Sequence, residues 1–266
     1  MVQSLFYNLN LQTMKKIKDT NEVYHSSDAI SASGLKYIYQ NSVQKFLQRQ
    51  AFSSKAMNLG SAVHAAMLEP AEYINDFHVM PKIDGRTKAG QEEKAKHEEL
   101  SKGKILLTAD ENEIVSSISG NYNQHELARK FCTGEIELSH YKQHEGVDVR
   151  IRPDVVNYKE GFISDVKTCQ DNSPKAFRRD VYKYGYPIQA VFYSEMLGID
   201  PSEFRFIAVQ TKHPFSVEVY AMSEQMIEYG REGWKQAFHD WKFYKETGIA
   251  LGHQTPEVKN DGTLIL

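Results

Sequence analysis

Cysteine is scarce in this chain, and its scarcity narrows the kinds of site that the protein can build. Only two cysteines, Cys132 and Cys169, occur among its 266 residues. Two thiols argue against a disulfide framework, and against a zinc or iron–sulfur site held by cysteines. We therefore expect the reducing cytoplasm to be the location of the protein.

Long apolar runs are missing as well. No stretch of about 18 consecutive apolar residues occurs, so the sequence predicts no transmembrane helix. The N-terminus lacks the apolar core of a signal peptide, because Lys15, Lys16 and Lys18 follow early in the chain.

An excess of positive charge is also lacking, because the formal net charge is −3. A protein that coats DNA along its whole surface is typically basic, so this balance argues against such a coat. It does not argue against an enzyme that cuts nucleic acid. Acidic metal ligands offset basic residues in such an enzyme, and the bound cations restore positive charge to its site.

The elements expected from capping residues and periodicity predict one α/β domain. Their order predicts a mixed central sheet flanked by helices, with an N-terminal helical elaboration. We expect a loosely ordered lead-in or arm over 1–28, the domain over 29–248 and a tail over 249–266. Helices are expected over 31–47, 58–68, 108–131, 174–184, 187–198 and from Ser223, and strands over 135–141, 147–156, 161–168, 204–210 and 214–220.

Two carboxylates and a lysine stand close together on two adjoining strands of this expected sheet. Asp154 lies on the first strand, and Asp165 and Lys167 share one face of the second, because strand side chains alternate. Magnesium prefers carboxylate and phosphate oxygens, and it activates water beside a phosphodiester. A lysine there can orient that water or offset charge on the phosphate. The pattern is short, and two surface carboxylates beside a solvated lysine would also produce it.

Three polar residues on neighbouring helices extend this pattern. His64 lies on an otherwise apolar helix, where it either completes a metal site or is an ordinary core histidine. Gln189 and Tyr193 are four residues apart and share a helix face. They either hold a phosphate or the lysine, or Tyr193 simply packs and Gln189 is exposed.

A basic and aromatic helix follows the central strands. Its cations suit phosphates and its rings suit unpaired bases, although a solvated helix with a core-facing aromatic stripe has the same composition. The cations are Lys175, Arg178, Arg179 and Lys183, and the rings are Phe177, Tyr182, Tyr184 and Tyr186.

Taken in order, these motifs resemble those of the RecB-like branch of the PD-(D/E)xK nucleases. Residues 31–35 and 59–70 sharpen the resemblance towards the C-terminal nuclease domain of the RecE (exonuclease VIII) family and its prophage relatives. The likeness covers about residues 28 to 245 and implies a restriction-endonuclease-like core. The motifs are Gly60-x-x-x-His64, Arg152-Pro-Asp154, Asp165-Val-Lys167 and Gln189-x-x-x-Tyr193.

The resemblance implies a role for each matching residue. Asp154 and Asp165 match the metal-binding carboxylates, Lys167 matches the catalytic lysine, and His64 matches a histidine at the metal site. Gln189 and Tyr193 match the helix motif that faces the site. Further ligands are expected from Glu137, with Glu135 as the competing choice, and from the Val166 carbonyl.

The same resemblance implies an activity. Such enzymes use Mg²⁺, which Mn²⁺ can replace, and degrade linear double-stranded DNA from its 5′ ends. They release mononucleotides and leave a 3′ single strand, which a RecT-like annealing protein receives. The resemblance also implies a ring-shaped homo-oligomer. DNA contacts are expected from Arg86, Lys88 and Arg152, and from the four cations of the basic helix.

Three alternatives stay open at this stage. A site-specific or structure-specific endonuclease on the same core would cut circular DNA, which an end-dependent exonuclease spares. A catalytically inactive DNA-binding module would keep the fold without the chemistry, but clustered buried carboxylates are costly without a metal. An α/β protein whose motif is a coincidence is the third.

Overall fold

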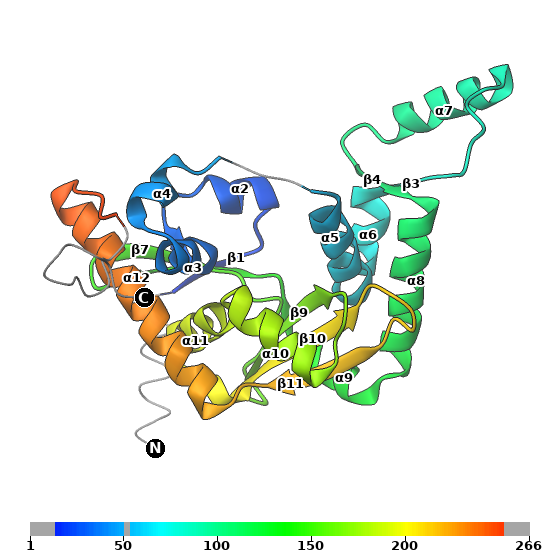
Figure 1. The fold of residues 1–266 in the computed structure, drawn as a ribbon. Helices are drawn as coiled ribbons and strands as arrows, with labels where there is room; N and C mark the ends of the chain where they lie inside the picture. The colour runs from blue at the N-terminus through cyan, green and yellow to red at the C-terminus, as the bar shows by residue number, and fades with distance from the viewer. Residues whose placement is uncertain (1–13, 51–53, 253–266) are drawn as a thin grey trace, which may run out of the picture.

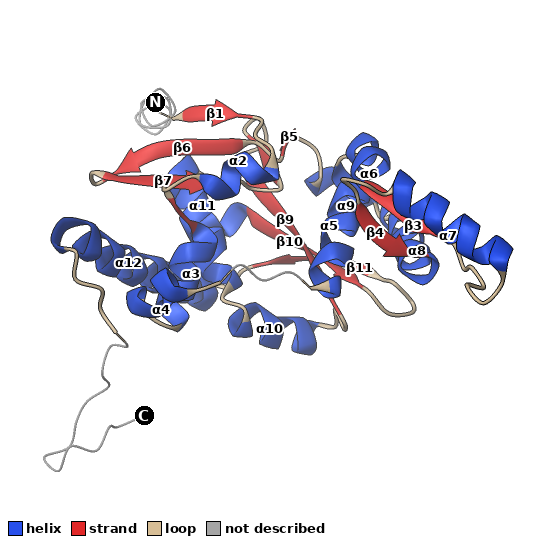
Figure 2. Cartoon of the chain, turned by 90° about the horizontal axis from the view of Figure 1, so that it is seen from above, coloured by secondary structure: helices blue, strands red, loops and turns tan. Residues whose placement is uncertain are grey.

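The computed structural model describes residues 14–50 and 54–252, which form three β-sheets with helices packed around them (Figures 1 and 2). The central sheet has the order β11-β10-β9-β8-β5. Strand β10 runs parallel to β9, whereas the other neighbours are antiparallel. The predicted mixed sheet is thereby confirmed. Its strands are β5 (Glu135–Ile136), β8 (Val155–Asn157), β9 (Phe162–Cys169), β10 (Phe204–Gln210) and β11 (Val217–Ala221).

A second sheet has the order β1-β6-β7-β2, and a third pairs β3 with β4. Part of the expected lead-in belongs to the second sheet, because residues 15–26 form β1 and helix α2, on which Tyr24 is buried. Residues 1–13 and most of the expected tail lie outside the described residues. The strands and helix are β1 (Lys15–Ile17), α2 (Asn21–Ser26), β2 (Ile30–Ser31), β6 (Ser139–His144), β7 (Val147–Ile151), β3 (Phe77–Met80) and β4 (Ile105–Thr108).

Two expected strands are wrong as single elements, because each divides between the first two sheets. The strand expected over 135–141 becomes β5 and β6, and that over 147–156 becomes β7 and β8. Pro153 interrupts the second, since proline donates no ladder hydrogen bond. Glu137 interrupts the first with a left-handed φ of 51°. The backbone N–H of Glu137 donates to the Asp154 carbonyl at 3.0 Å. The two places where the chain passes from one sheet to the other therefore lie side by side.

Helices cover both faces of the central sheet. One core contains Ile163, Phe206 and residues of α3, α11 and α12, and the other contains Val166, Ile207 and residues of α5, α8 and α9. Successive residues of β9 therefore face opposite cores, as a strand requires. The helices are α3 (Ala32–Gln40), α4 (Val43–Gln48), α5 (Lys55–Leu68), α6 (Pro70–Asp76), α7 (Lys88–Leu100), α8 (Ala109–Gln124), α9 (Glu126–Phe131), α10 (Pro174–Lys183), α11 (Tyr186–Leu197), η1 (Pro201–Glu203) and α12 (Glu224–Thr247).

Most helix starts agree with the sequence, but two helices are shorter than expected. Ser31 caps α3, which ends at Gln40. Ser42 accepts from the Lys45 N–H and starts α4 as a separate helix. His125 similarly ends α8 and caps α9 through its Nδ1. A side chain that caps a new helix competes with continuation of the old one, which explains both breaks.

The charged segment before and within α7 projects from the rest of the chain (Figures 1 and 2). Lys88 begins this helix, and Gly90 is its only buried residue. The segment is a loop followed by a largely exposed helix. Among residues 14–50 and 54–252, no helix combines the length and apolar character that crossing a membrane requires.

Close packing between α11 and α12 generates a stability prediction. A Cβ added at Gly230 of α12 would lie 2.3 Å from the Pro187 carbonyl oxygen and 2.8 Å from Val191 Cγ2. We expect Gly230→Ala to lower the free energy of unfolding by about 1–3 kcal/mol, because the helices must move apart. Urea unfolding followed by circular dichroism measures the change.

Gly120→Ala is the matched control, since Gly120 lies within α8 and nothing lies within 4 Å of its added Cβ. Removing backbone freedom from an open helical position should raise the stability by about 0.5–1 kcal/mol. A Gly230→Ala protein as stable as Gly120→Ala would contradict this account of the packing.

Candidate active site

The two places where the chain passes between the sheets put acidic residues beside Val166 of β9, whose backbone groups have no partner on β8. In the antiparallel register, Val155 pairs with Ser164, so its continuation would bring Pro153 opposite Val166. Proline has no N–H for the Val166 carbonyl to accept, and the ladder stops there. The Val166 N–H donates to a side chain, Asp154 Oδ2, at 2.6 Å. Asp154 is consequently buried, with 8% of its surface exposed.

His64 satisfies the other backbone group at this position. Its Nε2 lies 2.7 Å from the Val166 carbonyl oxygen. A carbonyl only accepts hydrogen bonds, so the bond assigns the proton to Nε2. Nδ1 then faces the acids, 3.3 Å from Asp154 Oδ2 and 3.9 Å from Glu137 Oε1. A histidine held through one nitrogen in this way presents the other to a metal.

Of the two competing glutamates, Glu137 is the one that faces the site. Its Oε2 lies 3.3 Å from Arg152 Nε, and its Oε1 lies towards His64. Its left-handed backbone costs roughly 1–2 kcal/mol for a residue with a Cβ. Glu135 instead forms an ion pair with Lys16 at 2.6 Å.

Asp165, Lys167 and Gln189 form a hydrogen-bonded cluster next to Asp154. Lys167 Nζ is paired with Asp165 Oδ2 and donates to Gln189 Oε1 at 3.3 Å. Gln189 Nε2 donates to Asp165 Oδ1 at 2.8 Å. The expectation that Gln189 holds the lysine agrees with these contacts. Tyr193 is buried, and its hydroxyl donates to the Arg152 carbonyl at 3.3 Å.

Burial and clustered negative charge make this site retain protons. Burial and the neighbouring Asp165 charge raise the pKa of Asp154 to about 8. Burial lowers the pKa of His64, but Asp154 and Glu137 outweigh it and raise the value to about 9. Burial likewise opposes the charged form of Lys167, yet Asp165 raises its pKa, so the lysine is charged at neutral pH. At neutral pH the site therefore retains the protons of Asp154, His64 and Lys167.

This donor set fits a divalent cation. One ligand atom each from His64, Glu137 and Asp154 lies within 4.8 Å of the others. Carboxylate oxygens with one imidazole suit Mg²⁺, Mn²⁺ or similar ions. The other two expected ligands are engaged elsewhere: both oxygens of Asp165 contact Lys167 or Gln189, and the Val166 carbonyl accepts from His64.

The expected DNA contacts are dispersed over the molecule. Arg152 lies inside the site, where it contacts Glu137 and lies 4.3 Å from the Tyr24 ring centroid. Arg86 is paired with Asp84 at 2.9 Å on the projecting segment before α7, with Lys88 beside it. The structure thus does not bring Arg86 and Lys88 to the acids (Figure 1). The cations of α10 are exposed, namely Lys175, Arg178, Arg179 and Lys183.

Sequence reasoning missed Lys36, which reaches the site from α3. Its Nζ lies 5.5 Å from the ring centroid of Tyr186, and Lys167 Nζ lies 4.7 Å from the same centroid. Burial, and then the charge of Lys167, lowers the pKa of Lys36 to about 8. Lys36 is 131 positions before Lys167 in the sequence, and no local pattern connects them.

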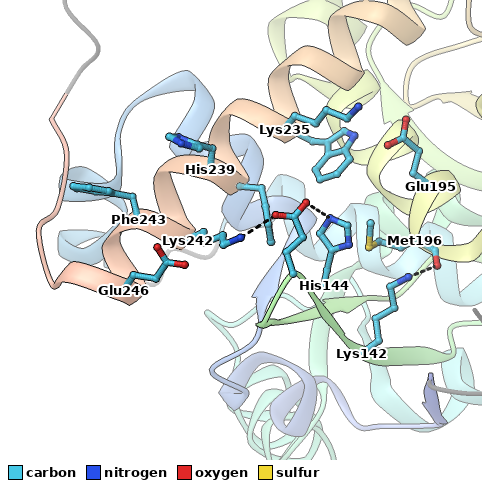
Figure 3. Close-up of a pocket in the computed structure, with 12 residues that line it drawn as sticks. Lys142, His144, Glu195, Met196, Lys235, His239, Lys242, Phe243 and Glu246 are labelled. Atoms are coloured by element: carbon cyan, nitrogen blue, oxygen red, sulfur yellow. Dashed lines mark hydrogen bonds and ion pairs between the residues drawn. The ribbon is translucent and has the colours of Figure 1, made fainter.

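A cavity of about 900 Å³ lies elsewhere, between α12, α11 and the β6–β7 hairpin (Figure 3). The aromatic side chains of His144, Trp234 and Phe238 line it, and Lys242 pairs with Glu145 at its edge at 3.0 Å. None of the residues around Asp154 lines this cavity, so it is separate from the acidic site.

Comparison with known proteins agrees with this fold. The family model for a PDDEXK-like domain of unknown function (DUF3799) matches residues 31–248. No curated protein matches the sequence. A crystal structure titled “Putative exonuclease”, from Eubacterium rectale, is similar with a TM-score of 0.59 and 15% identity over 88% of each chain, which shows the fold alone. A phage related exonuclease from Haemophilus somnus 129PT has a TM-score of 0.35 at 11% identity over 85% of this chain and 100% of its own, too low to carry an argument.

The geometry predicts that Glu137, and not Glu135, contributes to metal binding. We expect Glu137→Gln to weaken the binding of Mn²⁺ by about tenfold or more, because a ligand charge is lost. Glu135→Gln is the matched control and should bind Mn²⁺ as the unaltered protein does. Isothermal titration calorimetry measures both, and equal affinities of the two variants would exclude Glu137 as a ligand.

The retained protons predict a pH dependence of metal binding. A metal needs the deprotonated forms of Asp154 and His64, whose pKa values are raised to about 8 and about 9. Affinity should therefore rise with pH up to about 9, by at most roughly tenfold per unit for each proton released. Calorimetry in buffers of different ionisation enthalpy counts these protons, and metal binding without proton release would refute the assignment.

Proposed function

This chain belongs to the family of PDDEXK-like domains of unknown function (DUF3799), and we propose that it is a divalent-metal-dependent nuclease. One observation carries the proposal: His64, Glu137 and Asp154 face one another directly beside the cluster of Asp165 and Lys167. The protein of similar fold from Eubacterium rectale is described as a “Putative exonuclease”, which supports the same activity.

In this proposal, His64 Nδ1, Glu137 and Asp154 hold the metal. When bound, the metal polarises the phosphodiester and lowers the pKa of a coordinated water. The charged Lys167 orients the attacking water and offsets negative charge that develops on the phosphate. Asp165 and Gln189 fix the position of the Lys167 ammonium through their contacts with it.

The raised pKa of Lys167 also supports these separate roles for the metal and the lysine. Because the pKa of Lys167 is raised, the lysine is a poor general base at neutral pH. Its contribution is therefore electrostatic. Arg152 acts indirectly, through Glu137. Its Nε lies 3.3 Å from Glu137 Oε2 and keeps that carboxylate directed at His64.

The finer part of the proposal rests on the resemblance to the RecE family. The enzyme degrades linear double-stranded DNA from 5′ ends with Mg²⁺, releases mononucleotides and leaves a 3′ single strand. A RecT-like annealing protein receives that strand for recombination. Closure of several copies into a ring around DNA would explain how a chain of net charge −3 stays on its substrate.

A cleavage assay separates exonuclease from endonuclease. Linear duplex labelled at one 5′ or one 3′ end is incubated beside an intact circle, with Mg²⁺ and with EDTA. We expect early release of the 5′ label as mononucleotide, an intact circle and no reaction in EDTA. A cut circle would establish the endonuclease instead, and early loss of the 3′ label would reverse the polarity. No cleavage of either DNA would contradict the proposed function.

Lys167→Ala tests the catalytic assignment. We expect the cleavage rate to fall by about 100-fold or more, because the charge beside the scissile phosphate is lost. Duplex binding in EDTA, followed by fluorescence anisotropy, should change little. Lys159→Ala, on the exposed turn before β9, is the control and should cut normally. Cleavage by Lys167→Ala at the unaltered rate would show that Lys167 is not catalytic.

A further inference from the structure

Lys36 carries a half-buried ammonium with no anionic partner. Among residues 14–50 and 54–252, no side chain or carbonyl forms a hydrogen bond or ion pair with it. Its contact is instead the ring of Tyr186, 5.5 Å from Nζ to the centroid. A partly buried cation that no carboxylate contacts, and on which Asp165 acts only at longer range, is suited to bind an external anion.

The surrounding backbone fixes where Lys36 points. Gly185 is the N-cap of α11, with a φ of 61°, and a Cβ there would lie 3.0 Å from Lys36 Cγ. The aliphatic part of Lys36 thus packs against backbone that has no side chain. Gln40 Nε2 donates to the Lys183 carbonyl at 3.2 Å and joins the same helix to the same turn. The ammonium is therefore held over Tyr186.

Tyr186 also connects Lys36 to the catalytic cluster. Lys167 Nζ lies 4.7 Å from the same ring centroid, so both ammonium groups contact one ring. A substrate strand that places one phosphate at Lys167 is thereby brought close to Lys36. A second phosphate of that strand would meet a cation already in place.

The aromatic contact continues outward to the surface. The ring of Tyr184 stacks on that of Tyr186 with centroids 5.6 Å apart and planes at 27°. Tyr184 is 45% exposed, and Lys183 Nζ lies 5.0 Å from its ring centroid. Cations and rings therefore follow one another from the half-buried Lys167 to solvent. Grooves that bind single strands combine these two groups, cations for phosphates and rings for bases.

We propose that Lys36, Tyr186, Tyr184 and Lys183 form a strand-binding track beside Lys167. In this track Lys36 binds a phosphate of the substrate strand, and Tyr184 stacks against an unpaired base. The inference rests on the proposed nuclease function and adds that the strand is single-stranded where it meets the site. A base inside a duplex keeps both faces stacked on its neighbours, so it cannot use Tyr184.

The test uses a single-stranded oligonucleotide containing the fluorescent base 2-aminopurine, bound to the whole protein in EDTA so that no cleavage occurs. We expect binding to quench the fluorescence and Tyr184→Leu to abolish that quenching. Lys36→Gln should weaken binding and reduce the slope of log affinity against log salt by about one, since one phosphate contact is lost.

Matched controls come from the same region of the chain. Tyr39→Leu removes a tyrosine that is 38% exposed on α3, and Lys45→Gln removes an exposed lysine on α4. Both controls should keep the quenching and the salt slope. Lys36→Arg keeps the charge and should keep the slope, which separates loss of a phosphate contact from loss of folding.

Unchanged quenching in Tyr184→Leu, or an unchanged salt slope in Lys36→Gln, would overturn the track. So would an unaltered protein that binds the oligonucleotide without quenching. Because these measurements need no cleavage, they are independent of the proposed activity. A protein that cuts DNA but fails them has the nuclease function without the track, whereas one that passes them but cuts nothing has the track without the nuclease function.

Discussion

The site depends on an unfilled position in the hydrogen-bond ladder of β9. Pro153 would lie opposite Val166 and has no N–H for the Val166 carbonyl to accept, so the ladder ends there and both the carbonyl and the N–H of Val166 have side-chain partners. The carboxylate of Asp154 takes the N–H, and His64 takes the carbonyl. Backbone groups that would be costly to bury unpaired thus orient two metal-site side chains, and they do so from a rigid strand.

This arrangement concentrates carboxylates in a buried site, where ionising them costs free energy. Asp154, Asp165 and Glu137 share a small, largely buried volume, where burial and the charge of Asp165 raise the cost of ionising Asp154. Lys167 and Arg152 neutralise one carboxylate each, Asp165 and Glu137 respectively. Asp154 has only His64, so the cluster keeps a proton, which a divalent cation at the proposed site would replace. Binding of that cation would then recover the free-energy cost of burying these carboxylates.

The sequence predicted the parts of this site that local patterns encode. The shared face of Asp165 and Lys167 follows from strand periodicity, and the helix positions of His64 and Gln189 follow from capping and spacing. The mixed fold and the PD-(D/E)xK superfamily are confirmed, whereas closeness to the RecE family stays a prediction. The divided strands were missed because alternation alone does not show a change of sheet, although Pro153 was a visible signal. Lys36 depends on contact between distant helices, which no local pattern contains.

Opposite charges are distributed so that a polyanion can approach an acidic centre. The carboxylates lie inward, where a bound cation would compensate them, and the nearest uncompensated cations, Lys36 and Lys183, lie along Tyr186 and Tyr184. A strand guided along these rings would meet positive charge before it met the acids. With the proposed track, a chain of net charge −3 would need no basic surface to bind a DNA strand, because a short series of cations beside the site would suffice. The turn at Gly185, which packs against Lys36 and is followed by Tyr186, places that series next to Lys167.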